Sequence, residues 1–262
     1  MHRFSLLTLN IGNPSLKRVK QQIKWIEERN ESVFILTETK HSEGCLFLEQ
    51  HFTDTGWTMF DFGKEPEFNS YFPKSLTGDL GVMVLSKYPI VEIKNCFEKE
   101  NRFYSRFIDV TLDVYGLLLG IIGIYVPSRD ASQEKIERKK EFIIDFLQYI
   151  KNQSSDNSYP YIICGDLNVL ESSHIPRYSN FKKWEYDFYD RFDHFGFTDS
   201  FRFLHPVENE YSWVGRTNDG YRYDHCFVSK SIKETVEKCD YIHETRKIPI
   251  TDHSALMIEL YL

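Results

Sequence analysis

The residues Gly165-Asp166-Leu167-Asn168 place a carboxylate and a carboxamide two positions apart, directly after the apolar run Tyr161–Cys164. That run has the length and content of a buried strand. Side chains two residues apart on an extended chain point the same way, so Asp166 and Asn168 can reach into one site. Loops at strand ends often carry catalytic groups. The same motif could also be an Asx-rich turn that only ends a strand, and other residues must decide between these readings.

Six further side chains stand at comparable places along the chain. Asn10 and Glu38 follow predicted strands, Tyr125 ends one, Asp252 and His253 precede the last one, and Asp224 lies within the strand predicted at 221–229. Each of them alone has a structural explanation, such as a neighbour of a helix cap, an Asx turn or a solvated surface residue. Together, oxygen ligands without cysteine favour a hard cation such as Mg²⁺ or Mn²⁺, with its coordination completed by water and substrate phosphate.

The composition narrows the class of protein. Of the 262 residues, 41% are hydrophobic and 27% are charged, and no second composition regime is visible, so we predict a single domain spanning residues 1–262. The net charge of −7 excludes a chain coated in basic residues but leaves room for a local basic patch. The five cysteines form no Cys-x-x-Cys pair, which argues against a zinc cluster or a disulfide framework.

The N-terminal residues Met1–Ser5 show no signal-peptide pattern. No apolar run approaches the ~18 residues that a membrane-spanning helix needs. We therefore expect a soluble, cytoplasmic protein with no membrane partner and no obligate protein partner.

A strand, a helix and a second strand at the start of the chain set the geometry of the predicted site. The patterns predict buried strands at Phe4–Leu9 and Ser32–Leu36, and a helix from a Ser15 cap to Arg29. A unit of this length is a right-handed crossover between parallel strands. Asn10 and Glu38 should therefore lie at the same edge of one sheet.

The remaining chain predicts a mixed α/β (α+β) fold. Consecutive antiparallel strands are expected at 81–86, 90–97, 104–114 and 117–125, further strands at 161–164, 211–213, 221–229, 239–244 and 254–260, and helices at 46–51, 132–151 and 186–195. The lysines and arginines of the helix at 132–151 are expected on its outer face. Lys64–Leu76 is a polar insertion that we interpret as a loop and a candidate substrate lid.

Five motifs of this chain resemble those of the endonuclease/exonuclease/phosphatase superfamily, in the family's order. They are Leu6–Gly12, Ile35–Lys40, Gly165–Val169, Tyr221–Asp224 and Thr251–Ser254. Each motif is weak alone, whereas the set is highly specific and spans the whole chain. The resemblance implies a four-layer αββα sandwich, in which two mixed β-sheets pack face to face between helices, and metal-dependent hydrolysis of phosphoesters.

Within that superfamily the chain resembles the exonuclease III and apurinic endonuclease branch. Tyr125-Val126-Pro127 occupies a slot in which pancreatic-type deoxyribonucleases, deadenylases and sphingomyelinases carry a histidine, and Thr198–Arg202 and Tyr211–Trp213 also resemble the branch. Three features depart from it. The segment 214–220 is shorter than the branch's DNA-contacting loop, Leu170-Glu171 replaces a usual histidine, and Arg129 stands closer to Tyr125 than the branch's arginine. These departures bear on recognition of an abasic site more than on hydrolysis.

Hydrolysis of a phosphodiester needs an activated water and neutralised phosphoryl oxygens. On the positions that match the family, Glu38 is assigned as the main metal ligand, with Asn10 and Asp252 nearby. Asp166 is the best general base for the attacking water, and Asn168 would orient that water and hydrogen-bond the phosphate.

The remaining matched residues would stabilise developing charge. His253 would donate to a non-bridging oxygen, while Asp224 holds its imidazole in the right tautomer and keeps it protonated. Tyr125 would bind phosphate or assist the leaving group, and the sequence does not separate these two roles.

The leading hypothesis is a Mg²⁺- or Mn²⁺-dependent nuclease that acts on DNA, as an endonuclease or a 3′ exonuclease. Four side chains near the predicted site could bind phosphates or stack on a base or sugar: Arg106, Arg129, Arg222 and Trp213. The alternative is a phosphatase, or a phosphodiesterase for RNA or a small molecule, on the same scaffold. The acidic net charge and the shortened loop favour this alternative. A non-catalytic scaffold ranks last because all the key positions are filled.

Overall fold

The first of two β-sheets contains both ends of the chain. In a computed structural model that describes residues 2–54, 58–59, 78–155 and 158–262, its strands follow the order β13 (Val236–Ile242), β14 (Ala255–Tyr261), β1 (Arg3–Asn10), β2 (Val33–Thr39), β4 (Gly81–Ser86) and β3 (Thr58–Met59). The strands β1 and β2 are parallel, and the other neighbours are antiparallel. The predicted parallel pairing of the first two strands is thereby confirmed.

The second sheet is built from the middle of the chain. Its order is β5 (Ile90–Lys94), β6 (Phe107–Val114), β7 (Leu117–Tyr125), β8 (Tyr161–Asp166), β12 (Asp224–Ser229) and β9 (Phe197–Asp199). Here β7 and β8 are the parallel pair. Each sheet therefore contains one parallel pair, and these two pairs carry most of the predicted site residues at their carboxyl ends.

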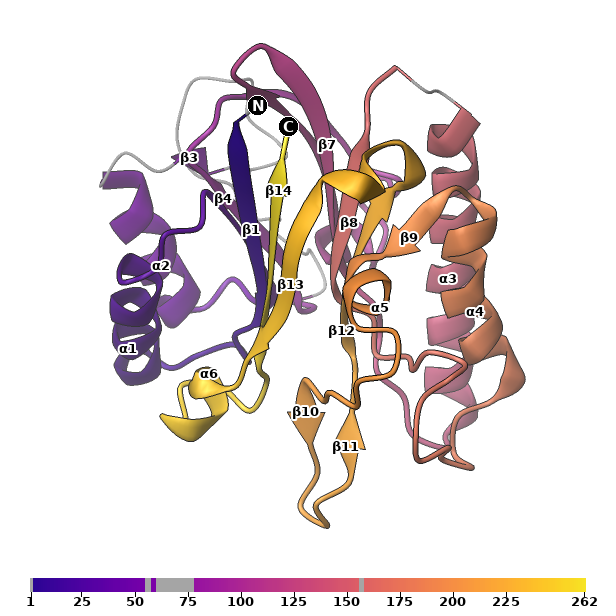
Figure 1. Ribbon diagram of the computed structural model, residues 1–262. Helices are drawn as coiled ribbons and strands as arrows, with labels where there is room; N and C mark the ends of the chain where they lie inside the picture. Colours follow the sequence, from indigo (N-terminus) through magenta and orange to yellow (C-terminus); the bar gives the residue numbers. More distant parts are fainter. Residues whose placement is uncertain (1, 55–57, 60–77, 156–157) are drawn as a thin grey trace.

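Helices cover the outer faces of both sheets (Figure 1). The helices α1 (Leu16–Glu27) and α2 (Glu43–Asp54) lie against the first sheet, and α3 (Gln133–Ser155) and α4 (Lys183–His194) lie against the second. Shorter elements complete the chain: the 3-10 turns Tyr104–Arg106 and Lys230–Thr235, the helices α5 (Ser200–Leu204) and α6 (Glu244–Lys247), and the hairpin of β10 (Trp213–Val214) and β11 (Gly220–Tyr221). This is the four-layer αββα sandwich that the family resemblance implies.

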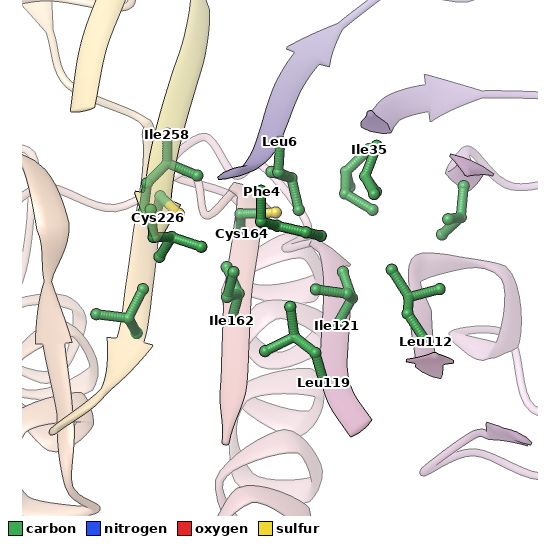
Figure 2. Packing of buried hydrophobic residues seen from close by; sticks show 14 of the residues in the cluster. Phe4, Leu6, Ile35, Leu112, Leu119, Ile121, Ile162, Cys164, Cys226 and Ile258 are labelled. Carbon is green, nitrogen blue, oxygen red and sulfur yellow. The ribbon is translucent and has the colours of Figure 1, made fainter. Parts of the chain in front are cut away.

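The core between the two sheets is apolar from both sides. Figure 2 shows Phe4, Leu6 and Ile35 of the first sheet facing Ile121 and Ile162 of the second, and all five are fully buried. Burial of a side chain of this size contributes roughly 1.5–3 kcal/mol. The rigid stack of sheets fixes the positions of the strand ends that carry the chemistry.

The helix α1 illustrates how local sequence sets these layers. Ser15 caps it, because the Ser15 hydroxyl accepts a hydrogen bond from the Arg18 amide at 3.4 Å. Val19, Ile23 and Ile26 then form the buried stripe that packs on the first sheet.

Two details of the strand prediction are wrong. The segments 81–86 and 90–97 are not neighbours, because β4 pairs with β2 in the first sheet while β5 is an edge strand of the second. The segment 221–229 is split into β11 and β12, since Arg222 turns into the interior between them. An alternating pattern identifies a strand without identifying its partner.

The four long helices all begin on the same side of the molecule. Each of α1, α2 and α3 follows, after a short loop, a strand that ends there, and α4 begins there after the longer segment 167–182 (Figure 1). None of the helices in the described ranges has the length and apolar content needed to cross a membrane. The insertion Lys64–Leu76, interpreted above as a candidate lid, lies outside the described residues.

Candidate active site

Asp166 lies at the end of β8, where the two sheets come together. Its Oδ2 accepts a 2.9 Å hydrogen bond from Asn10 Nδ2 at the end of β1, so one residue of each sheet contributes to this contact. The turn into Asp166 depends on Gly165, whose φ is +142°. A Cβ atom at Gly165 would lie 2.0 Å from the Ile124 carbonyl oxygen. Only glycine allows this approach.

The Asp166 carboxyl group is buried, with 1% of the residue exposed. Burial, together with the neighbouring Asp224 charge, raises the pKa of Asp166 to about 7. Its Oδ1 accepts a 2.9 Å hydrogen bond from the Asn168 amide. Both carboxylate oxygens are therefore held, and the group is poised to exchange a proton near neutral pH.

Asn168 sits in a strained turn with a φ of +50°. Asparagine tolerates this left-handed conformation better than most residues. Its carboxamide donates a 3.0 Å hydrogen bond to the Val126 carbonyl, which ties the turn after β8 to the end of β7. The Asn168 amide therefore contacts the Asp166 carboxylate, while its carboxamide is bound at the end of β7.

His253 and Asp224 form a buried pair beside Asp166. The His253 Nδ1 lies 2.8 Å from Asp224 Oδ2. Burial lowers the pKa of His253, but the Asp224 carboxylate more than compensates and raises it to about 9. The imidazole therefore carries a proton on both nitrogens at neutral pH. Ligand atoms of Asp166, Asp224 and His253 all lie within 4.8 Å of one another.

The donor set around this cluster fits a hard divalent cation. The Asp224 Oδ1 is buried and has no hydrogen-bond partner among the described residues. Glu38 offers a half-buried carboxylate whose Oε1 accepts from the Tyr125 hydroxyl at 3.0 Å. Oxygen donors of this kind suit Mg²⁺ or Mn²⁺.

Glu38 itself adopts a φ of +54°, a second strained backbone position at the site. Such positions concentrate where structure is held for function. Burial, with the nearby Glu38 and Asp166 charges, raises the pKa of Tyr125 well above its usual range, so the phenol stays protonated. Tyr125 can therefore act as a hydrogen-bond donor at neutral pH.

Asp252 lies at the outer side of the site and is exposed. Its Oδ2 accepts a 2.9 Å hydrogen bond from Trp213 Nε1, and Trp213 forms an isolated β-bridge with His253. The Trp213 ring is half-buried and packs against Tyr221 and Tyr223, with centroids 5.4 Å and 6.1 Å away. Trp213 thus borders the acidic cluster with an aromatic surface.

The substrate contact predicted for Arg222 is wrong. Arg222 is fully buried, and its guanidinium pairs with Glu171 and Asp199, each at 2.8 Å. A guanidinium enclosed by two carboxylates has no access to a phosphate. Arg222, which the Tyr221–Asp224 motif led us to place at the substrate, is instead part of the core.

The contacts predicted for Arg129 and Arg106 are also contradicted. The Arg129 side chain is 9% exposed and pairs with Glu185. Arg106 is 4% exposed, pairs with Asp79 at 3.1 Å and lies over the Tyr125 ring at 4.6 Å. Both arginines support neighbouring parts of the site instead of facing solvent.

Sequence reasoning missed two residues close to the site. Thr251 donates a 2.6 Å hydrogen bond to the Asn10 carbonyl, and its place in the Thr251–Ser254 motif could have indicated it. Lys139 was expected on the outer face of its helix. It is instead buried against the Asn168 carbonyl, and no local pattern indicates this.

A four-layer sandwich that presents buried carboxylates and a protonated imidazole where its sheets meet has the architecture of a phosphoester-hydrolysing enzyme. The family model described as Endonuclease/Exonuclease/phosphatase family matches residues 7–253, and the chain belongs to this family. Members of this family depend on metal ions. The resemblance read from the five motifs is confirmed.

The chain is similar in sequence to two curated proteins and in fold to a solved structure. The chain is 28% identical to the exodeoxyribonuclease of Bacillus subtilis over 248 residues, which cover 88% of this chain and 90% of that protein. It is 30% identical to exodeoxyribonuclease III of Haemophilus influenzae over 180 residues, covering 60% and 67%. Its fold is similar to that of an AP endonuclease from Archaeoglobus fulgidus, with 21% identity, a TM-score of 0.79, and coverage of 99% and 100%.

Proposed function

We propose that this protein is a Mg²⁺-dependent nuclease that hydrolyses phosphodiester bonds of DNA, within one catalytic domain spanning residues 1–262. The observation that carries the proposal is the protonated His253, held by Asp224, beside the Asp166 carboxylate. A base and a cationic hydrogen-bond donor a few ångströms apart suit in-line attack on a phosphate. Similarity to two exodeoxyribonucleases supports DNA as the substrate.

Glu38 would hold the metal ion, with Asn10 and Asp252 close to it. Their oxygen atoms, and the absence of cysteine from this set, favour Mg²⁺ and admit Mn²⁺. When bound, the ion neutralises charge on the phosphoryl oxygens. Asn10 also holds Asp166 Oδ2, so it would link the metal side of the site to the base.

Asp166 would accept a proton from the attacking water. As the water oxygen bonds to phosphorus, the bond from phosphorus to the leaving oxygen breaks, and the proton goes to the carboxylate. A pKa of about 7 leaves a large fraction of Asp166 ionised at neutral pH and makes it a base of suitable strength. Asn168 would orient this water and contact the phosphate, since its turn is fixed to Asp166.

His253 would donate to a non-bridging oxygen, which gains negative charge during the reaction. Its position beside Asp224 keeps the donor charged and fixes the ring through Nδ1, leaving Nε2 for the substrate. Tyr125, a protonated phenol bound to Glu38, would bind the phosphate or protonate the leaving oxygen. Trp213 would stack on a base or sugar at the edge of the site.

The test is a panel of substrates assayed with Mg²⁺, with Mn²⁺ and with EDTA. The panel contains supercoiled plasmid, a duplex with an abasic site, a duplex with recessed 3′ ends, single-stranded DNA, RNA, inositol phosphates and a generic phosphodiester. We expect hydrolysis of at least one DNA substrate, lost in EDTA and restored by Mg²⁺. Because DNA binding releases counterions, KM for DNA should rise steeply between 50 mM and 200 mM salt.

Two outcomes would overturn the proposal. Activity that survives EDTA would exclude the metal-dependent mechanism. Efficient hydrolysis of a small phosphoester, insensitive to salt and without any cleavage of DNA, would favour the phosphatase alternative.

A further inference from the structure

A buried group of three charged residues lies directly behind the turn that carries Asn168. We call it the turn-support cluster, and it consists of Lys139 on α3, Glu185 on α4 and Arg129 in the loop between β7 and α3. Lys139 and Glu185 are each only 1% exposed. Charges this deeply buried are costly unless they are paired, so their retention needs an explanation.

Lys139 connects this cluster to the catalytic turn. Its Nζ donates a 2.7 Å hydrogen bond to the backbone carbonyl of Asn168 and a 2.8 Å hydrogen bond to Glu185 Oε1. Arg129 donates through Nε to the same Oε1 at 3.1 Å and through a second nitrogen to Oε2. Two cations thus share one carboxylate, and one of them continues to the turn.

The turn needs such support because its backbone is strained. With a φ of +50°, Asn168 relaxes toward commoner conformations unless both sides are held. Its amide is held by Asp166 and its carboxamide by the Val126 carbonyl. Lys139 binds the backbone carbonyl of Asn168 itself, which restrains the ψ angle of this residue.

We propose that Lys139, oriented by Glu185, is a positioning residue that holds the Asn168 turn in its productive geometry. The inference rests on the proposed role of Asn168 in the reaction. Burial lowers the pKa of Lys139, and the Glu185 carboxylate opposes this shift. Arg129, predicted to contact substrate, acts here by fixing Glu185.

The test compares kcat and KM for the variant Lys139→Met with those of the wild-type protein. Methionine is also unbranched and only one atom shorter, and it removes the charge and the hydrogen-bond donors. We expect kcat to fall by about 10- to 100-fold, as displacement of a catalytic group by about 1 Å does, while KM stays within about twofold. Ile150→Ala, a buried residue of the same helix that lies three turns away, is the control for lost stability. This variant should have a lower Tm. Its kcat, measured at temperatures below that Tm, should equal that of the wild-type protein.

A double-mutant cycle with Asn168→Ala separates positioning from general destabilisation. If Lys139 acts through Asn168, Lys139→Met should cost little further activity in the Asn168→Ala background. Equal losses in both backgrounds, or wild-type kcat in a folded Lys139→Met protein, would overturn the inference. Wild-type activity of Asn168→Ala alone would instead overturn the proposed role of Asn168.

A second variant covers the case in which Lys139→Met does not fold. Glu185→Gln preserves the shape of the cluster and removes the charge that orients the lysine. We expect it to lower kcat in the same direction by a smaller factor, again with unchanged KM. An unchanged kcat in this variant would contradict the role of Glu185.

Discussion

Asn10 Nδ2 lies 2.9 Å from Asp166 Oδ2, and this contact joins the carboxyl end of β1 in one sheet to that of β8 in the other. The two residues are 156 positions apart in sequence. Because every layer of the sandwich must pack correctly before they can meet, the proposed site forms only when the whole fold forms.

Replacement of Asp166 by asparagine should abolish most of the proposed activity with little change in fold. Asparagine fits the same space but cannot accept the proton of water. We expect turnover to fall by about 10²-fold or more at pH 7.5, in saturating Mg²⁺. The measurement is kcat on the best DNA substrate, with circular dichroism as the control for folding. Near-wild-type turnover would remove Asp166 from the role of general base.

Replacement of His253 by alanine should also lower turnover by about 10²-fold or more, because the charged donor to the phosphoryl oxygen is lost. In contrast to Asp166→Asn, the His253→Ala substitution removes the cationic partner of the buried Asp224. We therefore expect a lower Tm as well as a lower kcat. Tm and kcat are measured on the same preparation of the variant. A fully active His253→Ala protein would contradict the role assigned to His253.

Replacement of Gly165 by alanine should destabilise the protein strongly. The new methyl group would approach the Ile124 carbonyl oxygen to 2.0 Å, so the ends of β7 and β8 must separate. Gly116→Ala is the matched control, since Gly116 also has a positive φ of +87° but has no atom within 4 Å of such a methyl group. Backbone strain alone costs roughly 1–3 kcal/mol. Chemical denaturation should show a clearly larger loss for Gly165→Ala, and equal losses would contradict the predicted clash.

Replacement of Arg222 by methionine tests the corrected role of that residue. Loss of one partner of a buried ion pair costs about 3–5 kcal/mol, and here it leaves Glu171 and Asp199 short of a cation. KM for DNA and its salt dependence should stay unchanged at temperatures where the variant is folded. A weaker salt dependence of KM in a variant of unchanged stability would instead show that Arg222 contacts the substrate.

The pH dependence of stability should show the buried carboxyl group of Asp109 on β6. Burial raises the pKa of Asp109 to about 7, although the Tyr149 hydroxyl donates to it at 2.5 Å. The folded protein then binds a proton that the unfolded chain releases near pH 4, so stability should fall as pH rises from about 4 to about 7. Asp109→Asn should remove this part of the slope, which amounts to at most about 4 kcal/mol. Urea denaturation at several pH values measures the free energy of unfolding of both proteins. The same pH dependence in the wild type and in Asp109→Asn would contradict the raised pKa of Asp109.

The local sequence predicted those features that depend on strand ends and on motif order. Asp166, Asp224 and His253 were predicted together because each belongs to a motif that resembles the family's, and the structure brings them within reach of one another. Partner choice is a non-local property, which is why the separation of β4 from β5 was missed.

The burial of Lys139 and Arg222 was missed for a different reason. A lysine or arginine reads as a surface residue until its carboxylate partner is known, and that partner lies far along the chain. Lys139 pairs with Glu185, and Arg222 pairs with Glu171, 51 positions away. Sequence periodicity contains no information about such pairs.

The shared starting side of α1, α2, α3 and α4 places four helix N-termini on the side of the molecule where the strands of the site end. Each helix carries roughly half a positive charge at its N-terminus, from amide groups that have no partner inside the helix. Four such ends lie on this side in a chain whose net charge is −7. These partial charges oppose the negative charge of Glu38, Asp166 and Asp224 at the same strand ends, so the backbone dipoles lower the electrostatic cost of bringing a polyanion to the site of an acidic protein.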